Sequence, residues 1–210
     1  MVLTCKKGQG NAIGYFLRQL VLTSVECWRP VAFIIENRKT NILYSEGDIV
    51  EDMLEVQKNL ADLVYVCDDD SIDFVEETYT FTNALTVNDL ANGSVVKAQL
   101  NGNENKNIIT CTNSSEVQMK IIFRKTAGVC SMDDNFNFIE QHHPVTSDTN
   151  VLNSIHSIVK RFAFSIQEKA NNTEEINITM ESLIPNEKGI LIQCIEEAKE
   201  ILSSMLEELN

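Results

Sequence analysis

The chain has 210 residues, with 31 acidic against 17 basic side chains and a formal net charge of −14. Phosphate binding depends on clustered lysine and arginine, so this balance argues against a protein that grips nucleic acid over most of its surface. An acidic surface is compatible with solubility or with a basic protein partner. Hydrophobic residues make up 43% of the chain, enough for a sizeable core, and no apolar run approaches the roughly 20 residues of a membrane helix.

Six cysteines are spread widely and irregularly, with no C-x-x-C pair. This spacing is unlike that of a zinc site, and a chain of this size does not need a disulfide framework. We therefore expect buried thiols in a reducing compartment.

The chain begins with a predicted strand end over Met1–Thr4 and a glycine-bearing turn. A helix is predicted to start near Asn11, which is a good N-cap residue. The apolar residues that follow recur at helical spacing and make one continuous stripe: Ile13, Phe16, Leu17, Leu20 and Val21.

Strand patterns dominate the middle of the chain, from Cys27 to about Asn150. A short helix is predicted to open at Asp48, and residues 126–150 are predicted to be an irregular, polar surface excursion. The predicted strands are runs of strand formers or alternate in character: Val31–Ile35, Leu63–Cys67, Phe74–Phe81, Ile108–Thr112 and Val117–Phe123.

Two further strands, Val159–Ile166 and Ile176–Met180, precede a long closing helix over Glu187–Leu209. One face of that helix is apolar over three turns or more, as in a helix–helix seam: Leu191, Cys194, Ile195, Ala198, Leu202, Met205, Leu206 and Leu209. The two most amphipathic helices thus stand at opposite ends of the chain. Their stripes can meet each other or a second copy, or each can simply cover its own sheet.

The residues over Lys7–Ser24, KGQGNAIGYFLRQLVLTS, resemble the first-helix signature R-G-x-G-x-T-L-G-N-A-L-R-R-x-L-L-S-S of bacterial and plastid RNA polymerase alpha subunits. Three later segments are similar to that family in the same order: Val50–Leu60, Val159–Phe164, and Ile176–Glu181 with the closing helix. Each motif is short, but together they span nearly the whole chain.

The resemblance implies an α+β fold: a dimerisation domain of residues 1–26 plus 158–210, with two amphipathic helices on a small antiparallel sheet, and an inserted β-rich domain of residues 27–157. It implies a dimer interface containing Ile13, Phe16, Leu17, Leu20, Leu202, Met205 and Leu206. It also implies contacts with the beta or beta-prime subunit through Arg18, Gln19, Leu22, Glu55 and Arg161.

The function that the resemblance implies is a non-catalytic subunit of a DNA-directed RNA polymerase. The chain would dimerise with a second alpha subunit and scaffold the beta and beta-prime subunits. It would need no cofactor, bind no DNA directly and contact no membrane. The expected location is cytoplasmic and nucleoid-associated, or the plastid stroma.

The chain departs from the family pattern where the beta subunit would be held. Gln19 replaces the second arginine of the signature, Tyr15 and Phe16 replace Asn-Ala, and Ala61 replaces a lysine. These changes suggest a divergent copy that pairs with a more typical alpha and takes the beta-prime-facing place. Lineage drift is the alternative.

Other chemistry finds little support in the sequence. The acidic runs Asp68–Asp70 and Asp133–Asp134 have the polar surroundings of solvated turns, and adjacent His142 and His143 point in different directions on a strand. His156 is isolated farther along. The rival functions are a dimeric protein-binding adaptor of the same fold outside transcription and, third, an enzyme whose site lies in the insert.

Overall fold

In a computed structural model, the protein is described over residues 1–38, 40, 48–69, 71–100, 102, 104–113, 115–183 and 187–208. Within these ranges, the side chains of Glu187, Glu197 and residues 201–208 are not described. The chain divides into two compact units, each described by itself. We call Met1–Glu26 with Ser157–Asn210 the terminal unit, and Cys27–His156 the inserted unit.

The terminal unit contains an antiparallel sheet in the order β1 (Val2–Lys6), β13 (Thr173–Ser182), β12 (Val159–Lys169). β13 lies in the middle and alternates in burial: Glu174, Ile176 and Ile178 are buried, whereas the residues between them are more exposed. Because successive strand side chains point to opposite faces, the sheet has one apolar face to cover.

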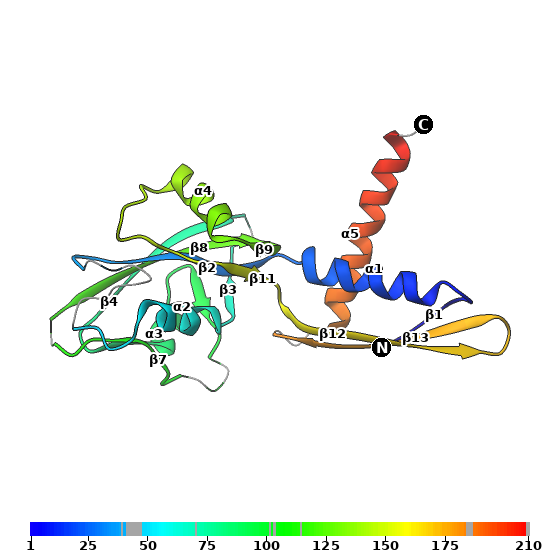
Figure 1. The fold of residues 1–210 in the computed structure, drawn as a ribbon, viewed down its shortest axis with the longest axis horizontal. Helices are drawn as coiled ribbons and strands as arrows, with labels where there is room; N and C mark the ends of the chain where they lie inside the picture. The colour runs from blue at the N-terminus through cyan, green and yellow to red at the C-terminus, as the bar shows by residue number, and fades with distance from the viewer. Residues whose placement is uncertain are drawn as a thin grey trace. The chain divides into compact units, whose positions relative to one another are not determined.

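Helix α1 (Gly10–Thr23) covers that face, and α5 (Glu187–Glu208) packs against both α1 and β13. Figure 1 shows α5 crossing α1 and continuing beyond it. The buried residues of α1 are Gly10, Gly14, Leu17 and Val21. Among the α5 side chains that the structure describes, the buried ones are Ile190, Leu191, Cys194 and Ala198.

The inserted unit is built on a larger antiparallel sheet. Its strands follow in the order β4 (Phe74–Phe81), β8 (Val117–Thr126), β2 (Cys27–Ile35), β3 (Tyr65–Cys67) and β6 (Val96–Ala98), with β10 (Asn150–Val151) also on β2. Separate antiparallel pairs join β5 (Ala84–Thr86) to β7 (Asn107–Thr110), and β9 (Gly128–Cys130) to β11 (Ser154–His156).

Helices cover both faces of this larger sheet (Figure 1). α2 (Met53–Ala61) and α3 (Val87–Ala91) pack with Phe33, Ile121 and Phe123 in the main core. α4 (Met132–His142) packs through Ile139 on the opposite face, with Val31 and Ile122. In the part of the chain that is described, no helix is long and apolar enough to span a membrane.

The mixed α+β class with antiparallel sheets is confirmed, and the finer architecture of a dimerisation domain stays a prediction. The irregular stretch predicted over residues 126–150 is wrong, because it contains β9 and α4. Ser131 caps α4: its hydroxyl accepts from the Asp134 N–H at 3.1 Å, and the Asp134 carboxylate accepts from the Ser131 N–H at 2.9 Å. This capping box begins a helix whose apolar side then packs on the sheet.

Two predicted helix starts are also corrected. The first helix begins at Gly10 after an N-cap at Gln9, and Asn11 is an exposed helical residue. The helix predicted to open at Asp48 begins at Met53, where the Asp52 carboxylate accepts from the Glu55 N–H at 2.7 Å. The earlier residue Ile49 forms a bridge with Cys111 instead.

Candidate partner-binding site

A carboxylate from a distant strand holds the start of α1. Glu174 on β13 accepts from the Gly8 N–H at 2.9 Å and from the Gly10 N–H at 2.8 Å. The first N–H groups of a helix have no carbonyl partner within the helix and favour a negative charge. These two hydrogen bonds, more than the nearby Lys7, lower the pKa of Glu174. Glu174 therefore replaces the local cap that the sequence predicted.

Glycines let α1 lie close to the sheet. A Cβ atom on Gly10 would stand 2.7 Å from the Glu174 carboxylate, and one on Gly14 would overlap the ring of Phe164. Gly8 has a positive φ of 88°, which glycine adopts without strain at the turn between β1 and α1. The close approach of backbone to ring fixes how α1 sits over β12.

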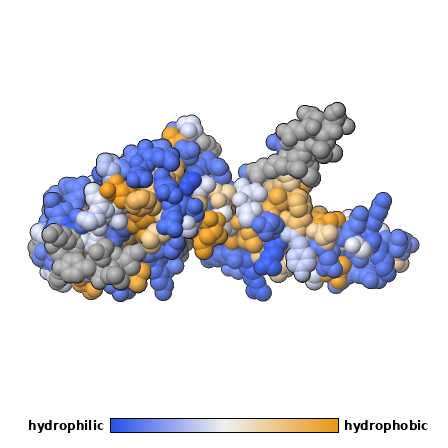
Figure 2. Space-filling model, turned by 45° about the horizontal axis from the view of Figure 1, so that its top comes forward, coloured by the Kyte–Doolittle hydropathy of each residue, from blue (hydrophilic) through white to orange (hydrophobic). Residues whose placement is uncertain are grey.

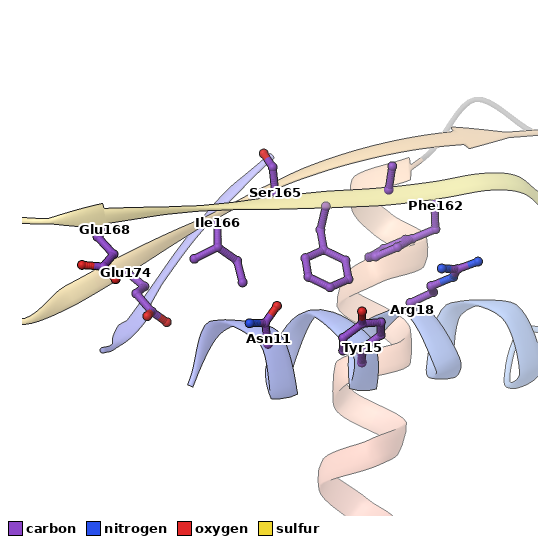
Figure 3. Close-up of a pocket in the computed structure, with 10 residues that line it drawn as sticks. Asn11, Tyr15, Arg18, Phe162, Ser165, Ile166, Glu168 and Glu174 are labelled. Carbon is purple, nitrogen blue, oxygen red and sulfur yellow. The ribbon is translucent and has the colours of Figure 1, made fainter. Parts of the chain in front are cut away.

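A groove of about 580 Å³ runs between α1 and β12. Figure 3 shows Asn11, Tyr15 and Arg18 along its helical side, with Phe162 and Ile166 reaching in from β12. The Tyr15 ring meets the Phe164 ring edge to face, with 5.3 Å between centroids. The groove therefore combines an apolar floor with a polar wall.

The opposite flank of α1 is apolar. It carries three of the residues predicted for the dimer interface: Ile13 and Leu20 are half-buried, and Phe16 is 48% exposed. On α5, Ile192 and Ile195 are exposed as well. Figure 2 shows apolar surface gathered on the terminal unit where α5 leaves α1.

The remaining predicted interface residues differ in their placement. Leu17 is only 4% exposed, so almost none of its side chain is left for contact with a second copy. Leu202, Met205 and Leu206 lie on the α5 backbone, but their side chains, like Leu209, are outside the described residues.

The residues predicted to contact beta or beta-prime fall in both units. Arg18 and Gln19 are exposed on α1, Leu22 is half-buried, and Arg161 is exposed on β12. Glu55 is exposed on α2, in the inserted unit. There it lines a groove of about 410 Å³. The other lining residues are Asp52, Leu54, Lys58, Asn59, Asp62 and Lys106.

The histidines and acidic residues considered as metal ligands take part in ring stacking, an ion pair and a helix cap. His142 stacks on Phe74 with 5.0 Å between ring centroids, and the His143 Nδ1 lies 2.6 Å from the Glu76 carboxylate. Asp134 belongs to the cap of α4, and Asp70 lies outside the described residues. Among the described residues, no group of His, Cys, Asp or Glu is arranged to hold a metal ion.

One serine–histidine contact superficially resembles a catalytic pair. The His156 Nε2 lies 2.8 Å from the Ser154 hydroxyl, and its Nδ1 lies 3.0 Å from the Cys27 carbonyl oxygen. A carbonyl only accepts, so Nδ1 carries the proton and Nε2 accepts from the hydroxyl. His156 is fully buried, which lowers its pKa to about 4. With both side chains sealed from solvent, this pair ties β11 to β2 and cannot meet a substrate.

Sequence reasoning missed the Glu174 anchor, although a signal was present. Glu174 lies two residues before the predicted strand Ile176–Met180. An extension of that strand would place its carboxylate on the same face as Ile176 and Ile178, on an otherwise apolar side. The surfaces around α1 thus comprise an exposed apolar flank and, on the other side, the groove along β12. No protein-family model matches the chain, and no curated protein sequence matches it.

Proposed function

We propose that this chain is a non-catalytic alpha-type subunit of a multisubunit DNA-directed RNA polymerase. It would dimerise with a second alpha subunit and provide the platform on which the beta and beta-prime subunits assemble. Phosphodiester formation would belong to those larger subunits. The residues over Lys7–Ser24 and the three later segments resemble the alpha family in order, which supports this assignment over a generic adaptor.

The observation that carries the proposal is the joining of the two chain ends. Residues from the first and last quarters of the sequence form one unit, in which α1 and α5 pack together. That unit keeps Phe16, Ile192 and Ile195 exposed. Burial of apolar surface drives most protein association, at roughly 25 cal/mol per Å². A second copy placed on this surface would remove it from water.

The distribution of charge favours basic protein partners. The inserted unit holds 20 of the 31 acidic residues but only 9 of the 17 basic ones. Complementary charge speeds encounter and selects partners more than it adds affinity. The inserted unit would therefore meet a basic region of a large subunit, with Glu55 in its α2 groove as one contact.

A co-purification experiment tests the assignment. The affinity-tagged chain, recovered from its native cells, should bring down a second alpha and two large subunits, identified by mass spectrometry. Recovery of the chain with unrelated proteins would favour the adaptor, and recovery alone as a monomer would overturn both. A pure homodimer within active polymerase would contradict the divergent-copy hypothesis.

Dimerisation itself is tested by Phe16→Glu, which puts a charge on the apolar flank of α1. Sedimentation should show that the variant is monomeric at concentrations where the wild type is dimeric. Asn11→Glu is the matched control, because it adds the same charge at an exposed position on the other flank. If both variants stayed dimeric, the apolar flank would not be the interface.

A further inference from the structure

The outer edge of β12 is open. β12 is the last strand of its sheet, and among the described residues its ladder partner is β13 alone. Every second N–H and C=O group along the outer side of such a strand points away from the sheet. An unpaired edge of this kind is a template for another strand.

The groove beside α1 lies along this edge. Five consecutive residues of β12, Phe162–Ile166, line it, although their side chains alternate between the two faces of the sheet. The groove is therefore bordered by the backbone of the strand as well as by one row of side chains. An added strand would find the apolar side chains of Phe162 and Ile166 on the groove side (Figure 3), together with Phe164, whose ring contacts Tyr15 of α1.

The helical wall of the groove offers unused polar groups. Within the described structure, the side chains of Asn11, Tyr15 and Arg18 form no hydrogen bond or ion pair, and all three are exposed. At the other end, the Glu168 carboxylate is paired with Lys7 at 2.8 Å. Glu174 is occupied by the Gly8 and Gly10 N–H groups. Of the charged residues that line the groove, Arg18 is therefore the one whose charge is not neutralised by a partner in the described structure.

We propose that this groove binds an extended segment of a partner protein, which adds to β12 as a further strand. Backbone hydrogen bonds to the β12 edge would supply affinity, as in other cases of strand addition. Specificity would come from apolar side chains at every second position, which enter the groove, and from a carboxylate that pairs with Arg18. The inference goes beyond the proposed function, because it depends only on the edge and the groove.

Defined peptides test this mode of binding on the full-length chain. The probe is a capped eight-residue peptide that alternates valine and serine and carries a glutamate, made in two forms with the glutamate at either end. Matched peptides carry lysine instead, or N-methyl groups at alternate residues that remove strand hydrogen bonds. Binding is followed by fluorescence anisotropy, and the edge amides of β12 by hydrogen exchange.

We expect one glutamate peptide to bind about fivefold more tightly than its lysine counterpart, an effect in the range of one exposed ion pair. The N-methylated form should not bind, and the bound peptide should slow exchange at the β12 edge. Arg18→Glu should reverse the preference between glutamate and lysine. Lys188→Glu is the control, since it makes the same charge change at an exposed position outside the groove.

Several outcomes would overturn the proposal. Binding that survives N-methylation, or a preference that Arg18→Glu leaves unchanged, would exclude strand addition at this groove. Protection of the β12 edge in the peptide-free protein that grows with protein concentration would show that a second copy occupies the edge instead. Circular dichroism of Arg18→Glu and Arg18→Gln separates these results from a loss of fold.

Discussion

The two units of the chain seat their helices in different ways. In the inserted unit, α2 and α3 present large side chains to a sheet in which Phe33 and Phe123 are fully buried. In the terminal unit, α1 presents Gly10 and Gly14 to the sheet, so that backbone lies against a ring and a carboxylate. The inserted unit thus holds these helices through large apolar side chains, whereas the terminal unit holds α1 through glycines and leaves Phe16 of that helix exposed.

Both units nevertheless use the same polar device. Glu77 on β4 is buried and accepts from the Val95 N–H at 2.6 Å, the Val96 N–H at 2.7 Å and the Tyr79 hydroxyl at 2.8 Å. Glu174 does the same for the turn before α1. In each case a strand carboxylate satisfies backbone donors that regular structure leaves unpaired. The two carboxylates fix different features: Glu77 holds an internal turn, and Glu174 holds the start of α1.

The largest expected change in stability comes from a substitution in the core of the inserted unit. Phe123→Ala removes a fully buried ring from its core and should lower the free energy of unfolding of that unit by about 3–5 kcal/mol. Trp28, the one tryptophan of the chain, lies in the same core, so its fluorescence during urea unfolding reports on this unit.

Because the proposed dimer surface lies on the terminal unit, the Phe123→Ala variant should still dimerise at urea concentrations below the midpoint of its unfolding. Val129→Ala is the control, because Val129 is 77% exposed and should change stability by less than about 0.5 kcal/mol. A cost for Phe123→Ala below about 1 kcal/mol would mean that the core is not the main support of the inserted unit.

Glu77→Gln should cause the next largest loss of stability. The amide keeps one acceptor oxygen but loses the charge and faces three backbone N–H groups, counting that of Ser94 at 3.1 Å. We expect a loss of about 2 kcal/mol in urea unfolding followed by Trp28, typical of a buried charged hydrogen-bond acceptor. Glu76→Gln, at the preceding residue of β4, should cost much less, because the Glu76 carboxylate is partly exposed and pairs with the His143 side chain instead of with buried backbone N–H groups. Equal losses of stability at the two positions would contradict the role of Glu77 as an acceptor for these backbone N–H groups.

Gly14→Ala tests the close seating of α1 in the terminal unit. Alanine favours a helix over glycine by about 1 kcal/mol, but its Cβ would overlap the Phe164 ring, and such overpacking costs about 1–3 kcal/mol. We expect a net loss of about 1 kcal/mol, seen as faster hydrogen exchange in α1. Adding Phe164→Leu should restore much of the loss, because it makes room for the methyl group. If Gly14→Ala alone slowed exchange in α1, the close contact would not be real.

Much of the fold follows from periodicity. β4 spans Phe74–Phe81, as the alternation predicts, and the closing helix starts at Glu187, as its stripe predicts. The spacing of apolar residues along a strand or helix reflects which of its faces is buried and which is exposed to water. What escaped prediction depends on contacts between distant residues. The spacing of residues in the sequence does not reveal that Glu174 contacts Gly10, or that the Phe164 ring leaves room only for glycine at position 14. These residues are far apart in the sequence and meet only when the sheet and α1 have formed.

The same limit applies to the site. Phe16 and Arg18 are two residues apart in a helix and were assigned to different partners by resemblance. Their separation onto opposite flanks follows from helical geometry, but the edge of β12 beside Arg18 is visible only once the strand order is known. Helix α4 was missed for another reason: its polar composition hid a capping box at Ser131 and a narrow apolar side around Ile139.

The smallest effect concerns pH. The folded-state pKa of Glu174 lies below its ordinary value of 4.5 because the Gly8 and Gly10 N–H groups favour the ionised form. The carboxylate therefore stabilises the terminal unit above about that pH, and this contribution disappears as the pH falls through the folded pKa. Glu174→Gln should leave the terminal unit less stable at pH 7, and should flatten the fall in stability between neutral and acidic pH.

The backbone amide signals of Gly8 and Gly10 in a pH titration measure this directly. In the wild type they should shift with a midpoint below 4.5, and in Glu174→Gln that shift should vanish. Glu175→Gln is the matched control, since Glu175 is the next residue on β13 and pairs with Lys169 at 2.9 Å instead of with the helix. If the glycine signals followed Glu175, or did not titrate, α1 would be held by packing on Phe164 alone. The parallel between Glu174 and Glu77 would then fail, and the glycines of α1 would remain as the contrast between the two units.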